Sequence, residues 1–168
     1  ILGVAWVCPY EGQIPAERII ALADHFWAAG ADELALADTI GHATPLNVGR
    51  LCETVGQRTD MDKLAVHLHD TLAFGLANAS AAISAGVRMI DSAVGGLGGC
   101  PFAPGSAGNL ATEDLVLLAH KMGFETGISL DALMSAVEIA EDLVGRPLGG
   151  RTRNWWLANK ERLRGEAA

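Results

Sequence analysis

Short apolar runs alternate along the chain with longer segments whose apolar residues recur at helical spacing. The short runs predict strands over residues 2–7, 33–37, 64–68 and 88–91, and the longer segments predict helices over 15–29, from 45, over 73–85, from 112, and from 129 to about 145. Strands that alternate with helices in this way are typical of parallel βαβ units. The pattern therefore predicts an α/β fold with a parallel sheet.

Residues at the predicted helix ends agree with this assignment. Thr44, Thr112 and Ser129 each precede a helical segment and are predicted to cap it with a side-chain oxygen. Glu113 and Asp114 fall in the first turn after Thr112, where the helix dipole favours carboxylates. These ends place the helices between the predicted strands.

His67-Leu68-His69 lies at the end of the third predicted strand. Side chains on a strand alternate between its two faces, so both imidazoles are predicted to point to the same side. Two neutral imidazoles on one face make half of a divalent-metal site. The alternative is that they are two polar residues at the end of a strand.

A long glycine-rich segment without charged residues lies between Ser92 and Thr112. Its glycines and prolines would leave backbone groups unsatisfied in lipid, so it is not predicted to span a membrane. Such a segment ahead of a helix suits a mobile lid that carries one reactive side chain, Cys100, over a site. The alternative for Cys100 is a small buried residue. The glycines that surround the cysteine are Gly95, Gly96, Gly98 and Gly99.

Several motifs resemble the 3-hydroxy-3-methylglutaryl-CoA lyase family in their order and spacing. They are Cys-Pro-Tyr-Glu-Gly at 8–12, Asp-Thr-Ile-Gly at 38–41, Val-His-Leu-His-Asp-Thr at 66–71, Gly-Gly-Leu-Gly-Gly-Cys-Pro at 95–101 and Gly-Asn-Leu-Ala-Thr-Glu-Asp at 108–114. The glycine–cysteine motif is specific to this lyase group, whereas the His-x-His is shared across a metal-dependent TIM-barrel superfamily. The resemblance runs from about Leu2 to Val144 and covers the family's C-terminal half. It implies a (β/α)8 TIM-barrel fold, here strands five to eight with C-terminal helices.

This resemblance implies a retro-Claisen lyase that cleaves the acyl-CoA thioester 3-hydroxy-3-methylglutaryl-CoA to acetyl-CoA and acetoacetate. Two departures from the family pattern bear on the substrate: Ala35-Leu36-Ala37 stands where the family commonly has Ser-Leu-Gly, and residues 72–78 lack its Tyr and Gln. The alternatives are a lyase for another 3-hydroxyacyl-CoA, or an inactive half-barrel that needs a partner. A Claisen synthase is disfavoured by the Gly-Cys-Pro motif.

The same resemblance implies the roles of individual residues. His67, His69 and the side-chain oxygen of Asn109 would bind a divalent cation, Mg²⁺ or Mn²⁺, and the predicted catalytic residues are Cys100, Asp38 and His67. Cys100 would act in proton transfer, and Asp38 would serve as an acid/base or orient the substrate.

The residues themselves leave other roles open. Asp38 has the alternative of a turn carboxylate ahead of residues 39–41, and Asn109 that of a turn residue after Gly108. We interpret Asp70 as an outer partner that holds a metal-binding imidazole. In the family, further site residues come from the first strands of the barrel, so the site in this chain is expected to be incomplete.

Composition narrows the class of protein. The chain has 168 residues, half of them hydrophobic, and a formal net charge of −8, which argues against binding nucleic acid or an anionic membrane surface. Three cysteines without framework spacing indicate a reducing compartment. We expect a cytoplasmic protein if the source is bacterial, and the sequence gives no basis for judging organelle targeting.

Residues 1–145 are predicted to form a partial barrel domain, and residues 146–168 are a tail that the pattern assigns to no element. A half-barrel has unpaired strands at both edges, which favour association with other chains. We therefore expect a homo-oligomer.

Overall fold

The computed structural model describes residues 1–98 and 108–166, without side-chain detail at 161 and 163–166. The chain divides into two compact units. The first contains residues 1–92 and 98–110, and the second contains residues 93–97 and 111–168.

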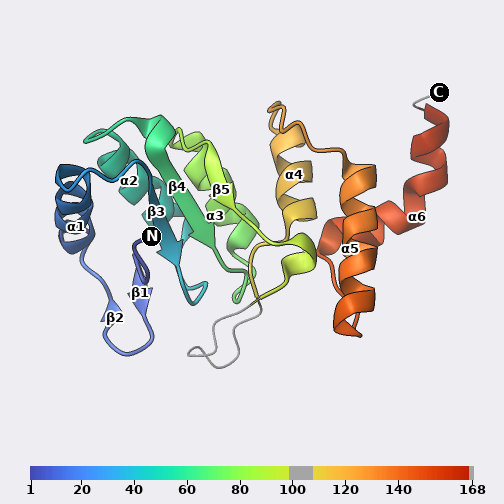
Figure 1. The fold of residues 1–168 in the computed structure, drawn as a ribbon, viewed down its shortest axis with the longest axis horizontal. Helices are drawn as coiled ribbons and strands as arrows, with labels where there is room; N and C mark the ends of the chain where they lie inside the picture. The colour runs from blue at the N-terminus through green and yellow to red at the C-terminus, as the bar shows by residue number, and fades with distance from the viewer. Residues whose placement is uncertain (99–107, 167–168) are drawn as a thin grey trace. The chain divides into compact units, whose positions relative to one another are not determined.

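A parallel sheet forms the centre of the first unit (Figure 1). Its strands are β3 (Leu34–Asp38), β4 (Leu64–Leu68) and β5 (Met89–Asp91), in the order β3-β4-β5. In this register Ala37 lies beside His67, and His67 lies beside Asp91. The α/β fold and the parallel sheet that the sequence predicts are confirmed, and β4 has the predicted bounds.

The strand predicted over residues 2–7 is wrong. Leu2 makes a single parallel bridge to Leu36, and Ala5 N–H donates to Ala37 O at 2.9 Å, but no continuous strand forms between them. Val4 has a φ of 49°, which ends the extended conformation, and its N–H donates to Thr39 Oγ1 at 2.8 Å. A short antiparallel hairpin follows, formed by β1 (Val7–Cys8) and β2 (Gly12–Gln13).

Helices α1 (Ala16–Ala28), α2 (Pro45–Gly56) and α3 (Gly75–Ser84) complete the first unit, with a 3₁₀ turn, η1, at Met61–Lys63. Helices α2 and α3 contact each other and pack on β4 (Figure 1). Alternate strand residues Leu36, Val66 and Leu68 are fully buried and form the core. Thr44 accepts from Asn47 N–H, which confirms the predicted cap of α2.

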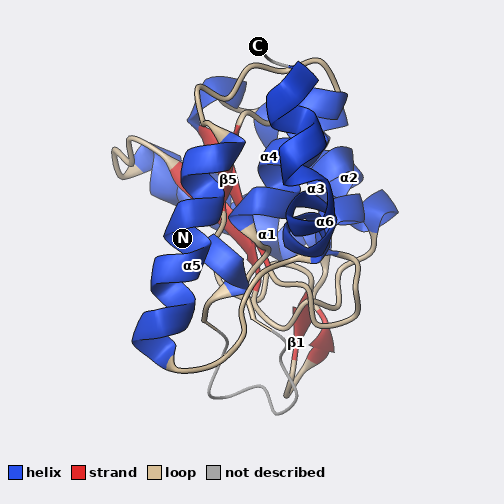
Figure 2. Ribbon diagram, turned by 90° about the vertical axis from the view of Figure 1, so that its right-hand side faces the viewer, coloured by secondary structure: helices blue, strands red, loops and turns tan. Residues whose placement is uncertain are grey.

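The second unit has no strand among its described residues (Figure 2). It consists of the 3₁₀ turn η2 (Val94–Gly96) and helices α4 (Thr112–Lys121), α5 (Leu130–Val144) and α6 (Arg151–Glu166). Ser129 caps α5 as predicted. The predicted Thr112 cap is wrong: α4 begins at Thr112 itself, after Ala111 in an extended conformation. Most of the unassigned tail is helical, and the domain boundary at residue 145 stays a prediction.

Two adjacent carboxylates hold the start of α6. Glu113, fully buried, accepts from Gly95 N–H at 3.0 Å and from Gly150 N–H at 2.6 Å. Asp114 accepts from Arg151 N–H at 3.0 Å and from Thr152 N–H at 2.7 Å. These bonds satisfy the first backbone donors of α6, which explains why the helix begins there.

Cysteines of the first unit differ in their surroundings. Cys52 on α2 is fully buried, and burial raises the pKa of its thiol to about 12. Cys8 on β1 is half-buried.

Across the described part of the chain, no helix has the length and apolar character needed to cross a membrane.

Candidate metal and catalytic site

The two predicted metal-binding histidines lie together at the carboxyl end of β4. Their ring centroids are 5.0 Å apart and their planes are nearly perpendicular, at 77°. His67 is within the strand and His69 follows it, so the alternation of side chains brings both rings to one face. On the same face the residues that neighbour His67 are small, Ala37 and Ala65, and His67 itself is half-buried.

The orientation of His69 is fixed by the backbone of the next strand. Its Nδ1 lies 2.9 Å from the carbonyl oxygen of Asp38, and the ring is buried. Because a carbonyl oxygen can only accept, Nδ1–H is the donor, which leaves Nε2 as the ring nitrogen that could bind a cation. A backbone-held imidazole of this kind is a common form of metal ligand.

His67 lies beside a carboxylate that the sequence analysis missed. Its Nδ1 lies 3.6 Å from Asp91 Oδ2. Burial lowers the pKa of His67, the neighbouring His69 lowers this pKa further, and Asp91 opposes both effects. The ring is therefore neutral at pH 7 and can offer a lone pair to a cation. Asp91 could have been found because the carboxyl ends of adjacent parallel strands meet at one edge of a sheet.

Asn109 lies opposite His69 through an antiparallel bridge. Its segment is held beside β4 by Leu110 N–H, which donates to Leu68 O at 3.0 Å, and by Gly108 O, which accepts from Asp70 N–H at 3.2 Å. Gly98 has a φ of 105°, and a Cβ there would lie 2.5 Å from Asn109 Nδ2. Glycine at this position leaves room for the amide, which gives one residue of the glycine motif a physical role.

This donor set fits part of a metal site. Two imidazoles and an amide are brought together, a combination that accepts a divalent cation when oxygen ligands complete the shell. Over residues 1–98 and 108–166, no group of three or more His, Cys, Asp or Glu side chains is suited to hold a metal ion. The remaining ligands are therefore not supplied by such a group in the described residues.

Asp38 is fully buried, and in the register of the sheet it lies beside Leu68, whereas Ala37 lies beside His67. Oδ1 accepts from His42 N–H and Oδ2 from Ala43 N–H, both at 3.0 Å. Burial raises the pKa of Asp38, and the two backbone donors act in the opposite direction. This placement agrees with the turn carboxylate that the sequence left open, and the catalytic role of Asp38 stays a prediction.

Asn78 is a second residue that the sequence analysis missed. It is fully buried on α3, and its Nδ2 donates to Ala43 O at 3.0 Å. It therefore supports the same turn that Asp38 holds, and Asp38 in turn supports His69 through its carbonyl oxygen. A polar residue on an apolar helix face is the signal that could have drawn attention to it.

Asp70 has a different partner from the one we expected. Its Oδ1 accepts from Gly75 N–H at 2.7 Å, at the start of α3. This bond, with Ala73 at a φ of 60°, explains why α3 begins at Gly75 rather than at the predicted Ala73. The groups found beside the imidazoles are the Asp38 carbonyl and the Asp91 carboxylate instead.

The other glycine-motif residues fall in different parts of the chain. Gly95 and Gly96, with φ values of 64° and 67°, form the turn η2 of the second unit. Gly99 and Cys100 lie outside the described residues. The lid and the catalytic cysteine therefore stay predictions.

Comparison with known proteins agrees with the motifs. Residues 3–140 match the family model described as HMGL-like. The chain is 46% identical over 147 residues to an (R)-citramalyl-CoA lyase of Chloroflexus aurantiacus, covering 88% of this chain and 46% of that protein. It is 41% identical over 150 residues to a hydroxymethylglutaryl-CoA lyase of Bacillus subtilis, covering 89% of this chain and 50% of that protein. The chain thus spans about half the length of these curated relatives.

A solved structure shows the same fold. An HMG-CoA lyase from Acinetobacter baumannii, in complex with coenzyme A and 3-methylmalate, superposes with a TM-score of 0.85 at 39% identity. The match covers 89% of this chain and 49% of that chain. The parallel sheet with its helices is accordingly part of a TIM barrel, and the chain belongs to the HMGL-like family.

Proposed function

We propose that this chain supplies part of the active site of a metal-dependent carbon–carbon lyase that acts on a 3-hydroxyacyl-CoA thioester. The observation that carries this proposal is the pair of imidazoles at the end of β4, beside Asn109. The carboxyl ends of the strands are where TIM-barrel enzymes place their chemistry. The names of the relatives, and the coenzyme A bound to one of them, support an acyl-CoA substrate.

His67, His69 and Asn109 would hold the cation, Mg²⁺ or Mn²⁺. When bound, the cation would polarise the substrate's hydroxyl and carbonyl oxygens and lower the cost of forming an alkoxide. Asp91 and the Asp38 carbonyl would keep the two rings oriented with Nε2 toward the ion. Further ligands would come from the half of the barrel that this chain does not span.

The proposed reaction is a retro-Claisen cleavage. A base removes the proton of the tertiary hydroxyl, the electron pair of that O–H bond forms a ketone, and the bond to the thioester's α-carbon breaks. The electrons of the broken bond form a thioester enolate, which takes a proton at carbon. In our proposal Cys100 provides or relays this proton, and Asp38 orients His69 through its backbone.

Two substrates are favoured by particular observations. The sequence motifs favour 3-hydroxy-3-methylglutaryl-CoA, which would yield acetyl-CoA and acetoacetate. The 46% identity to a protein named (R)-citramalyl-CoA lyase favours a second candidate, in which the carboxylate lies one methylene closer to the hydroxyl-bearing carbon. Because one methylene changes binding by only about 1–3 kcal/mol, the two substrates are best separated by comparing kcat/KM.

Metal binding is tested on the chain itself. Calorimetric titration with Mn²⁺ should show weak binding, because half of the coordination shell is missing, and His67→Ala should abolish it. His25→Ala changes an exposed histidine on α1 and should leave the binding unchanged. Unchanged binding in His67→Ala would remove this imidazole from the proposed site.

Turnover is tested with both thioesters, with and without a polypeptide that supplies the first four strands. Release of acetyl-CoA only in the mixture would indicate a half-barrel that needs a partner.

In a full-length context, Cys100→Ala should lower kcat about a hundredfold or more, leave KM within a few-fold, and retain metal binding. Near-normal kcat in that variant would exclude the proton-transfer role.

We also propose that the chain self-associates through its sheet edges, since unpaired strand edges favour pairing between molecules. Light scattering should then give a mass above that of one chain. A compact, stable monomer would contradict this proposal.

A further inference from the structure

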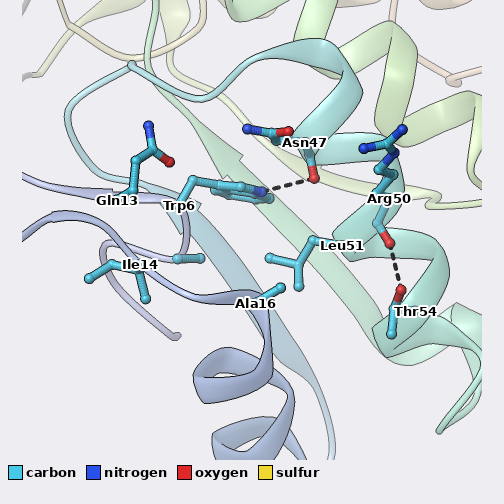
Figure 3. Close-up of a pocket in the computed structure, with 9 residues that line it drawn as sticks. Trp6, Gln13, Ile14, Ala16, Asn47, Arg50, Leu51 and Thr54 are labelled. Atoms are coloured by element: carbon cyan, nitrogen blue, oxygen red, sulfur yellow. Dashed lines mark hydrogen bonds between the residues drawn. The ribbon is translucent and has the colours of Figure 1, made fainter.

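A cavity of about 290 Å³ lies in the first unit between the hairpin β1–β2 and helix α2 (Figure 3). Its lining includes none of the residues assigned above to the metal site. Trp6 and Leu51 are buried and form an apolar floor together with Ile14. Trp6 Nε1–H donates to Asn47 O at 3.1 Å, which joins the floor of the cavity to α2.

Polar side chains line the same cavity from both sides. Gln13 comes from the hairpin, and Asn47 and Arg50 come from successive turns of α2 (Figure 3). All three residues are exposed, and within the described residues no side-chain hydrogen bond or ion pair is formed by any of them, so they meet solvent at the rim of the cavity. The other arginines of the described first unit do have partners: Arg18 pairs with Glu11, Arg58 with Asp24, and Arg88 donates to Ile83 O and Val87 O.

We propose that this cavity binds a small monocarboxylate with a short apolar body. A guanidinium binds a carboxylate with two parallel hydrogen bonds, so Arg50 would be the anchor of the ligand. The apolar body would lie over Ile14 and Leu51. A cavity of this volume is at the lower end of the range for ligand sites, which suits a small molecule.

Charge favours a single negative charge on the ligand. Arg50 is the one cationic side chain among the cavity's lining residues, and the chain as a whole carries a net charge of −8. A phosphate dianion would be opposed by the surrounding charge, whereas a monoanion is neutralised by one guanidinium. This proposal does not rest on the lyase function proposed above.

The probes are pentanoate and its neutral isostere pentanamide, titrated into the 168-residue chain and followed by ligand-observed NMR. Pentanoate should bind saturably and at least tenfold more tightly than pentanamide, since charge-assisted hydrogen bonds contribute that much. Arg50→Gln should weaken pentanoate binding about tenfold. Arg58→Gln removes the same charge from an ion pair outside the cavity and should leave binding unchanged.

A second variant tests the apolar part of the site. Ala16 lines the cavity at the exposed start of α1, so Ala16→Leu should fill the space without altering Arg50 and should weaken pentanoate binding. Thermal unfolding of each variant checks that the fold is retained.

Four outcomes would overturn the proposal. They are equal binding of pentanoate and pentanamide, an equal effect of Arg50→Gln and Arg58→Gln, full binding in Ala16→Leu, and tighter binding of inorganic phosphate than of pentanoate. The second outcome would indicate non-specific charge attraction, and the last would indicate a phosphate site instead.

Discussion

Asp38 in the first unit and Glu113 in the second are both fully buried carboxylates, and each accepts two backbone N–H groups. They differ in what those bonds hold. Asp38 closes a turn whose parent strand presents a carbonyl oxygen to His69, a proposed metal ligand. Glu113 joins η2 to the residue before α6. Full burial and two backbone hydrogen bonds are therefore found both in a carboxylate beside the candidate site and in one that only organises the backbone. These two features do not by themselves identify a residue of the site.

Their neighbours sharpen this difference. Asp114 lies next to Glu113 and adds two more backbone acceptor bonds, so two adjacent carboxylates hold the start of one helix. Asp38 has no such acidic neighbour in sequence, and its turn is supported by the neutral amide of Asn78.

The largest effect is expected at Glu113. Replacing it by alanine leaves the N–H groups of Gly95 and Gly150 without their charged acceptor, so Glu113→Ala should lower the free energy of unfolding by about 4 kcal/mol, at about 2 kcal/mol for each bond. Urea unfolding measures this loss. Glu125→Ala, at an exposed position, should change the value by less than about 0.5 kcal/mol. A loss below about 1 kcal/mol at Glu113 would mean that these bonds do not stabilise the unit.

A smaller and equal effect is expected when each carboxylate becomes an amide. Asp38→Asn and Glu113→Gln both keep one acceptor oxygen and turn an NH₂ group toward a backbone N–H. Each substitution should therefore lower the free energy of unfolding by about 2 kcal/mol, as measured by urea unfolding. Only Asp38→Asn should also weaken Mn²⁺ binding, because His69 depends on the Asp38 backbone. Equal Mn²⁺ affinity in the two variants would separate Asp38 from the metal site.

Asn78→Ala should lower the free energy of unfolding by about 1.5 kcal/mol, because it removes one buried hydrogen bond and leaves Ala43 O without its amide donor. Asn154→Ala, on the exposed surface of α6, is the matched control and should be neutral within about 0.5 kcal/mol. Urea unfolding compares the two. A neutral Asn78→Ala would show that the turn around Asp38 is stable without support from α3.

The smallest effect concerns pH. Because the folded protein lowers the pKa of His67 below its usual 6.5, the unfolded chain binds more protons as the pH falls through this value. The free energy of unfolding should therefore decrease below about pH 6.5 and be unaffected by this group above about pH 7.5. His67→Gln should flatten that slope in urea unfolding measured at several pH values. A slope that persists in His67→Gln would assign it to other groups.

The local pattern of apolar and polar residues was sufficient to predict part of the fold and part of the candidate site. An apolar run with two histidines at its end predicts both β4 and the shared face of the two rings. Local pattern alone did not reveal Asp91 beside His67, since that contact depends on the register between separate strands; the shared edge of parallel strands was the signal that could have found it. Helix α6 was missed for a similar reason: its start is fixed by Asp114, which lies far away in sequence. The loss of the first strand depends on the unusual backbone of Val4.

The burial of Cys52 has a practical consequence for chemical labelling. With a pKa of about 12, its thiolate makes up about one part in 100,000 at pH 7, and the side chain is inaccessible as well. An alkylating reagent should therefore leave Cys52 unlabelled in the native chain. In Cys8→Ser, Cys100 is then the one other cysteine of the sequence, so any labelling reports on Cys100 without changing a single residue of the glycine-rich segment.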